Sequence, residues 1–171
     1  MKNPYVRKQK AALLFAEMVE VGSIEKFFCL VERMDISEET WDELVDYLLS
    51  KFQTQIYEIA KSLTYFVPRV SPQMGKRICY ALISRGAVRS VCAAKEKSQQ
   101  GISTEELCML TTAVIGYHRE NELEALLSEI RTTSIKDTHI ARQLGELLSP
   151  VFCTGGKKLN VIARIGVSIG V

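Results

Sequence analysis

The residue types that most often perform chemistry are sparse in this chain of 171 residues. His118 and His139 are its two histidines, and no cysteine or carboxylate stands at metal-ligand spacing around both of them. A structural zinc site takes four protein ligands, and a catalytic one usually takes three. We therefore expect the two histidines to be surface or helix-capping residues, and we predict no metal site.

Paired carboxylates offer a second kind of chemistry, general acid–base catalysis. The pairs here, such as Glu38-Glu39 and Glu105-Glu106, fall in the first turns of expected helices, where the helix dipole stabilises negative charge. Acid–base catalysis needs instead a pocket that shifts a pKa. Because no Ser–His–Asp or Cys–His arrangement can be built either, the sequence predicts a protein that is not an enzyme, with no catalytic residues and no cofactor.

Positively charged residues are the remaining candidates for a site. Residues 70–101 carry six bases against the single acid Glu96. Four of these bases are expected on two successive helices of one hairpin, where they could contact RNA phosphates together: Lys76, Arg77, Arg85 and Arg89. Tyr80 lies among them and could stack on a base, although a tyrosine at helical spacing is more often a core residue. Solvated helix faces are the alternative interpretation, since a net charge of +2 gives RNA binding no wider support.

A glycine-lysine run near the C-terminus is a minor candidate for phosphate binding. The run Thr154-Gly155-Gly156-Lys157-Lys158 lacks a preceding strand and the full frame of a phosphate-binding loop. We expect a hairpin turn there. Its backbone amides, with Lys157 and Lys158, could still meet a phosphate.

The elements that must position these residues repeat along the chain. A β-branched apolar residue followed by a helix-starting polar residue recurs as Ile36-Ser37, Val70-Ser71, Ile102-Ser103 and Ile135-Lys136, at steps of 34, 32 and 33 residues. Such a period is typical of helical-hairpin repeats. It predicts a single domain over residues 1–171 with units of about 3–35, 36–69, 70–101, 102–134 and 135–171.

Local signals divide each unit into two helices. Ser37 and Ser103 can cap helices, and Ser103 with Glu106 forms a capping box. Ser71-Pro72 is a third helix start, with proline at the first helical position. Turns are expected near Gly22, Gln53-Thr54, Gly86, Glu120-Asn121 and Gly155-Gly156. The predicted helices cover 4–21, 24–34, 37–52, 55–66, 72–85, 87–99, 103–118, 121–132, 137–149 and 157–168.

The predicted fold class is all-α. A single helical hairpin cannot bury its apolar stripe, whereas stacked hairpins can. The sequence therefore predicts an α-solenoid of about five antiparallel helix-turn-helix repeats of roughly 33 residues. Trp41 is expected to be buried at a junction between units, because it falls where Ile36 can pack on it ahead of the helix.

Cysteine usage and hydropathy bear on the compartment. The five cysteines are odd in number, and all but Cys153 fall inside apolar helical runs, so we expect buried, reduced thiols. A reducing intracellular compartment follows from that expectation. No apolar run has the length of a membrane span, and the basic start of the chain lacks the apolar core of a secretory signal.

The C-terminal segment is the second candidate surface. It is apolar from Leu159 to Val171 and ends without a polar cap, although terminal repeats normally need a polar outer face. We expect a protein partner or another copy to cover it, unless the chain is a fragment of a longer array. The residues expected at that contact are Leu159, Ile162, Ile165 and Ile169.

The hairpin pattern resembles pentatricopeptide-type repeats. Val19 to Met34 is similar to that family's turn and second helix, Gly101-Ile102-Ser103 to its linker, and Thr40 to Val45 to its first helix. The resemblance implies an RNA-binding protein or ribonucleoprotein subunit of an organelle such as the mitochondrion; otherwise we expect a cytoplasmic protein. The family's base-reading positions align with about Ala12, Leu44, Lys76 and Thr111, of which only Thr111 is small and polar, so contacts to the RNA backbone are expected instead.

Three functions remain open at this point. The first is a non-enzymatic helical-repeat scaffold, a subunit or assembly factor of an organelle ribonucleoprotein complex that contacts RNA backbone and proteins. The second is a protein–protein adaptor of the tetratricopeptide type with no RNA binding. The third is a compact helical regulatory domain.

Overall fold

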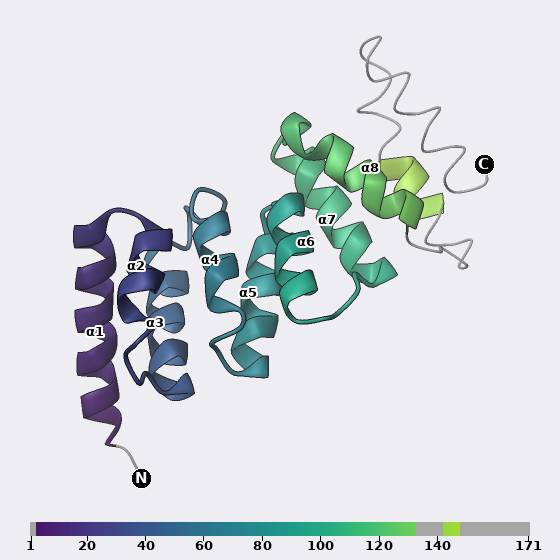
Figure 1. Cartoon of the computed structure of the whole chain (residues 1–171). Helices are drawn as coiled ribbons and strands as arrows, with labels where there is room; N and C mark the ends of the chain where they lie inside the picture. Colours follow the sequence, from purple (N-terminus) through teal and green to yellow (C-terminus); the bar gives the residue numbers. More distant parts are fainter. Residues whose placement is uncertain (1–2, 133–141, 148–171) are drawn as a thin grey trace. The chain divides into compact units, whose positions relative to one another are not determined.

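Helices are the regular elements of the described chain. The computed structural model describes residues 3–132 and 142–147, and every regular element within those ranges is a helix, which confirms the all-α fold class (Figure 1). The elements are α1 (Pro4–Val21), α2 (Ile24–Val31), α3 (Glu38–Lys51), α4 (Ala60–Phe66), α5 (Pro72–Ser84), α6 (Val88–Lys97), α7 (Thr104–Gly116), the short 3-10 helix η1 (Glu120–Glu122) and α8 (Leu123–Thr132). Residues 142–147 are helical as well.

Side-chain caps begin the helices where the sequence predicts. The hydroxyls of Ser37, Ser71 and Ser103 accept backbone N–H groups three residues on, at 3.3, 3.2 and 3.1 Å. The capping box of Ser103 and Glu106 is complete. Such caps satisfy N–H groups that have no partner inside the helix. The three predicted helix starts are thus confirmed.

Two predicted turns are confirmed by left-handed glycines. Gly22 has φ +70° and Gly86 has φ +73°, a conformation that costs a residue with a Cβ about 1–2 kcal/mol. Gly86 also lies against α7, because a Cβ there would approach the backbone N of Val114 to 3.0 Å. In the fourth hairpin the left-handed residue is His118 (φ 55°), so the turn comes earlier than the predicted Glu120-Asn121. Those two residues belong to η1 instead.

The helix predicted over 55–66 is wrong in its first half. Residues 52–54 and 56–59 form turns, with Gln55 N–H donating to the Phe52 carbonyl at 2.8 Å, and α4 begins only at Ala60. No side chain caps α4. Ile56 is buried nonetheless, so its apolar character reflects packing of a turn rather than a helix face. The helix predicted over 24–34 likewise ends early, at Val31.

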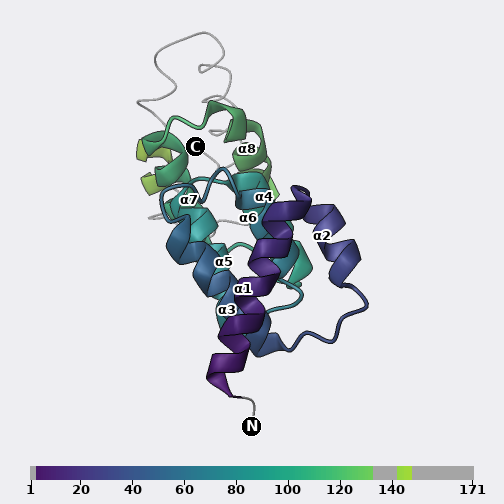
Figure 2. The same cartoon turned by 90° about the vertical axis from the view of Figure 1, so that its left-hand side faces the viewer.

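The chain divides into two compact units, Met1–Ile78 and Cys79–Val171, with the division inside α5. In the first unit α1 packs along α3 and also contacts α2, and α3 contacts α4 (Figures 1 and 2). In the second unit α8 packs against α6, α7 and η1. The single domain over residues 1–171 stays a prediction.

An aromatic cluster forms the core of the first unit. Trp41 is 6% exposed, and its ring centroid lies 6.4 Å from that of Phe27, 5.8 Å from Phe28 and 5.9 Å from Phe66. These partners come from α2 and α4, on either side of Trp41 in the sequence. The predicted burial of Trp41 is confirmed, and its position at a junction between repeat units stays a prediction.

Four helices bury residues at the same distances from their caps, which we call a shared register of burial. In α1, α3, α5 and α7 the residues eight and eleven places after the capping residue are buried. The pairs are Ala11 and Leu14, Val45 and Leu48, Cys79 and Leu82, and Thr111 and Val114. The four first helices of the predicted hairpins therefore bury residues at the same positions relative to their caps.

Candidate binding site

The predicted phosphate-binding residues of α5 lie on its exposed face. Lys76 and Arg77 are exposed, as is Tyr80, which is 63% exposed. The expectation that Tyr80 belongs to the core is wrong. Arg77 Nη2 lies 2.9 Å from Oδ1 of Asp46 on α3, and both side chains are 52% exposed. Arg77 is thus paired with an acid, whereas Lys76 makes no hydrogen bond or ion pair with any described residue.

Arg85 joins the end of α5 to the end of α7. Its Nη1 donates to the hydroxyl of Tyr117 at 3.0 Å, and its guanidinium carbon lies 5.6 Å from the centre of that ring. Arg119 lies 5.3 Å from the same ring centre and donates from Nε to the Arg85 carbonyl at 3.4 Å. These contacts join the turn after α5 to the turn after α7, so Arg85 has a structural role.

Arg89 joins the start of α6 to η1. Its backbone N–H donates to Oε2 of Glu122 at 3.1 Å, and its Nη2 donates to the Asn121 carbonyl at 3.3 Å. Glu122 is 6% exposed, so its carboxylate acts as a buried cap for the first turn of α6. The backbone of Arg89 therefore belongs to the contact between α6 and η1.

The four predicted phosphate-binding residues fall in two different units, and each pair is described within its own unit. Lys76 and Arg77 belong to the first unit, and Arg85 and Arg89 belong to the second. The other predicted site residues, Lys157, Lys158, Leu159, Ile162, Ile165 and Ile169, lie outside the described residues.

The positions aligned with base reading do not share an exposed face. Leu44 and Thr111 are fully buried, and the Thr111 hydroxyl donates to the Leu107 carbonyl at 2.7 Å. Only Ala12 and Lys76 of the aligned set are exposed. Thr111 is the one small polar residue of the set, and because it is fully buried it cannot contact a base of RNA.

The first unit has a groove between α1 and α3. Its volume is about 380 Å³, and α1 contributes Lys8, Ala11, Ala12 and Phe15, while α3 contributes Glu43, Asp46, Tyr47 and Ser50. The rings of Phe15 and Tyr47 meet edge to face at 4.9 Å. We call this the α1–α3 groove. It combines an apolar surface with both signs of charge.

The second unit has a groove of the same kind between α7 and the helical residues 142–147. Its volume is about 460 Å³, and it is lined by Cys108, Met109, Thr112, Gln143, Glu146 and Leu147. Both grooves use equivalent positions of the earlier helix: Lys8 and Cys108 are five residues after the cap, and Ala12 and Thr112 are nine. Neither groove was predictable from residue type, because none of these residues is unusual by itself. Counting from each cap would have found the exposed positions.

The thiols differ in exposure. Cys79 is buried, as predicted, whereas Cys29 is exposed and contradicts the prediction. Cys92 is half-buried, and its Sγ donates to Oε1 of Glu129 at 3.2 Å. Burial, together with the hydrogen bond and charge of Glu129, raises the pKa of the Cys92 thiol to about 12. Cys92 is thus held as a neutral thiol.

Metal sites and membrane spans are absent from the described ranges. No group of three or more histidine, cysteine or acidic side chains that could hold a metal ion occurs among residues 3–132 and 142–147. Within the same part of the chain, no helix combines the length and apolar character that crossing a bilayer requires. Comparison of the chain with protein-family models, curated proteins and solved structures finds no match.

Proposed function

We propose that this protein is a non-enzymatic helical-repeat scaffold that binds a segment of a partner protein along the exposed faces of its first helices. The observation that carries the proposal is the pair of grooves at equivalent repeat positions, one between α1 and α3 and one between α7 and residues 142–147. Repeat proteins commonly bind their ligands on surface positions that recur from one repeat to the next.

The finer fold belongs to the same proposal: about five stacked hairpins of the pentatricopeptide type form an α-solenoid. Three features support it. The serine caps recur at Ser37, Ser71 and Ser103, left-handed glycines recur at Gly22 and Gly86, and the register of burial recurs in four helices.

The chemistry of the grooves favours a protein partner over RNA. The α1–α3 groove contains the carboxylates of Glu43 and Asp46 beside Lys8, and the second groove contains Glu146. Carboxylates repel a polyphosphate backbone, which binds where Lys and Arg dominate. Arg77 and Arg85, predicted for phosphate contact, hold Asp46 and Tyr117 instead.

RNA contact is the second candidate, supported by one observation. Lys76 and Tyr80 are both exposed, one helical turn apart on α5, which suits a phosphate and a stacked base. The proposals of a ribonucleoprotein subunit and of a mitochondrial location rest on the family resemblance, and that of a reducing compartment rests on the cysteine pattern.

The test uses the intact protein as bait with and without nuclease. We expect a protein partner to be retained after nuclease treatment and to be lost from the groove-filling variants Ala12→Trp and Thr112→Trp. Met34→Trp, which enlarges an exposed residue outside both grooves, is the matched control and should retain the partner.

RNA binding is measured on the same protein with random-sequence RNA at low salt. Binding that falls in Lys76→Ala and Tyr80→Ala, with partners lost after nuclease, would favour the RNA candidate. A partner retained equally by both groove variants would contradict the proposed function.

A further inference from the structure

The α1–α3 groove has a surface suited to the aliphatic stem of a long side chain. Ala11 and Ala12 leave open space on the α1 side, because neither projects beyond its Cβ. Phe15 and Tyr47 supply aromatic surface, and Tyr47 is 45% exposed. A volume of about 380 Å³ accommodates one or two side chains of a partner protein rather than an entire secondary-structure element.

The chain itself already places cations on the walls of this groove. Lys51 Nζ lies 4.7 Å from the ring centre of Phe15 and 5.5 Å from that of Tyr47. Arg77 Nη2 lies 2.9 Å from the carboxylate of Asp46. Aromatic faces and carboxylates attract ammonium and guanidinium groups for the same electrostatic reason. The two contacts show which ligand charge these walls stabilise.

Glu43 is the carboxylate of the groove that no described residue neutralises. It is half-buried on α3, one turn before Tyr47, and makes no hydrogen bond or ion pair with a described side chain. Among the residues that line the groove, Lys8 carries the one ammonium and Glu43 and Asp46 carry carboxylates, while Lys51 and Arg77 lie at its walls on Phe15 and Asp46. Asp46 and Arg77 are each half-exposed, and an exposed ion pair contributes little to stability, so a ligand can compete with Arg77 for Asp46.

We propose that the α1–α3 groove receives an arginine or lysine side chain from a segment of the partner protein. Its stem lies against Ala12 and Phe15, and its cation meets Glu43 and Asp46. This inference rests on the proposed function, and it names the chemistry of one of the two grooves.

The test selects random 12-residue displayed peptides on the full-length protein. Peptides that bind should be enriched in arginine or lysine at one position. Replacing that residue in a synthetic peptide by citrulline, an uncharged analogue of arginine, should weaken binding about tenfold in fluorescence anisotropy, as expected for loss of a charge-assisted contact. Glu43→Gln should weaken binding by about three- to tenfold.

A charge exchange gives a sharper readout. Glu43→Lys should abolish binding of the arginine peptide and restore binding of the same peptide with glutamate at that position. Ala12→Trp should abolish both. Ala12 is exposed, so that variant should keep the wild-type circular dichroism spectrum.

Thr112→Trp separates this inference from the function on which it rests. Peptide binding that is lost in Thr112→Trp but kept in Ala12→Trp would retain a protein-binding scaffold and overturn the assignment to the α1–α3 groove. Selected peptides without a basic residue would overturn it as well. No selection of any peptide would count against both.

Discussion

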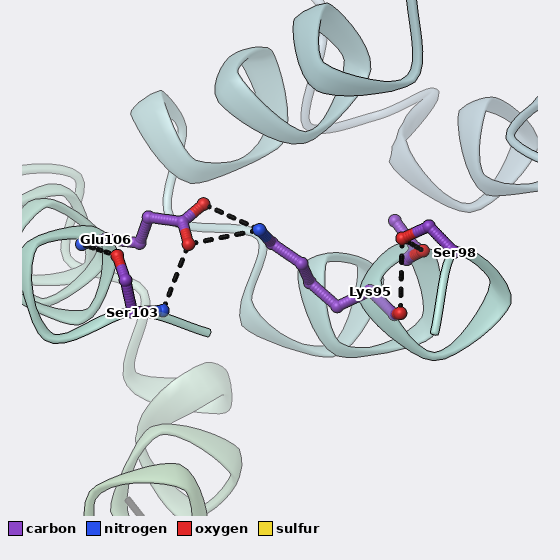
Figure 3. Close-up of polar contacts among 5 residues, drawn as sticks. Lys95, Ser98, Ser103 and Glu106 are labelled. Carbon is purple, nitrogen blue, oxygen red and sulfur yellow. Dashed lines mark hydrogen bonds and ion pairs between the residues drawn. The ribbon is translucent and has the colours of Figure 1, made fainter. Parts of the chain in front are cut away.

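Lys95 Nζ lies 2.9 Å from Oε2 of Glu106 and 3.0 Å from its Oε1 (Figure 3). The same Oε1 accepts the backbone N–H of Ser103 at 3.0 Å. The side chains of Lys95 and Glu106 are only 11% and 27% exposed. One carboxylate therefore joins the last turn of α6 to the first turn of α7 and completes the cap of α7.

Removing this carboxylate should destabilise the protein strongly. Glu106→Ala leaves the Lys95 ammonium largely buried without its partner and opens the capping box, so we expect a loss of about 2–4 kcal/mol in the free energy of unfolding. Urea denaturation followed by circular dichroism measures it. Asp46→Ala breaks a half-exposed ion pair instead and should cost less than about 1 kcal/mol. Equal losses of free energy of unfolding in the two variants would mean that the burial of Lys95 does not add to the cost of removing its partner.

Glu106 should also make the stability of the protein depend on pH in the acidic range. Burial opposes the charge of Glu106, but hydrogen bonds from Lys95 and from the Ser103 backbone outweigh it, so the pKa of Glu106 lies below its ordinary value. A carboxyl with a lowered pKa in the folded state stabilises the protein above its unfolded pKa of about 4.3, and that stabilisation is lost as the pH falls through the folded value.

We therefore expect the stability difference between the wild type and Glu106→Gln to be constant from pH 7 to about pH 5 and to shrink below about pH 4.3. Thermal unfolding at a series of pH values measures this difference. A difference that widens on acidification would show that the charge of Glu106 is not stabilising.

Trp41→Ala should cost about 3–5 kcal/mol, the usual range for removing a large aromatic side chain from a core. Trp41 is surrounded by Phe27, Phe28 and Phe66. Chemical denaturation followed by circular dichroism is the measurement, because Trp41 is the only tryptophan and its fluorescence disappears with it. Trp41→Phe, which keeps part of the ring contacts, should cost clearly less. A cost below about 1 kcal/mol in Trp41→Ala would contradict the repeat register.

Alanine variants of two glycines should distinguish the cost of backbone strain from the cost of a steric clash. Gly22 and Gly86 have nearly the same φ, but a Cβ at Gly22 meets nothing within 4 Å, whereas at Gly86 it meets the backbone of Ala113 and Val114 at 3.0–3.2 Å. Gly22→Ala should cost about 1–2 kcal/mol from the left-handed conformation. Gly86→Ala should cost at least about 1 kcal/mol more, because backbone must move. Midpoints of thermal unfolding compare the two variants, and equal shifts would contradict the close approach to α7.

Alkylation should distinguish the cysteines. At pH 8 iodoacetamide should modify Cys29, which is exposed, much faster than Cys92, whose pKa of about 12 leaves almost no thiolate. Peptide mapping by mass spectrometry reads each site separately. Glu129→Gln removes the charge that helps raise the pKa of Cys92, so the rate at Cys92 should increase. An unchanged alkylation rate at Cys92 in this variant would mean that burial alone protects the thiol. As a control, the denatured protein should be alkylated equally at Cys29 and Cys92.

The helix starts were predictable because their determinants are local. Ser37, Ser71 and Ser103 each bond an N–H only three residues away, and Pro72 needs no partner at all. The predicted start of α4 was wrong for the complementary reason. Ile56 has the apolar character of a helix face, but its burial comes from tertiary packing of a turn.

The sequence by itself determined the all-α class, the capped helix starts, the left-handed turns at Gly22 and Gly86 and the burial of Trp41, since each follows from residue type and short spacing. Only the tertiary structure decided which of the predicted phosphate-binding side chains are engaged in contacts within the protein. The guanidinium of Arg85 donates to the Tyr117 hydroxyl and that of Arg89 to the Asn121 carbonyl, each 32 residues further along the chain, so a cluster of bases in the sequence becomes a set of contacts between distant segments. The α1–α3 groove depends on the same long-range packing, because neither helix forms it alone.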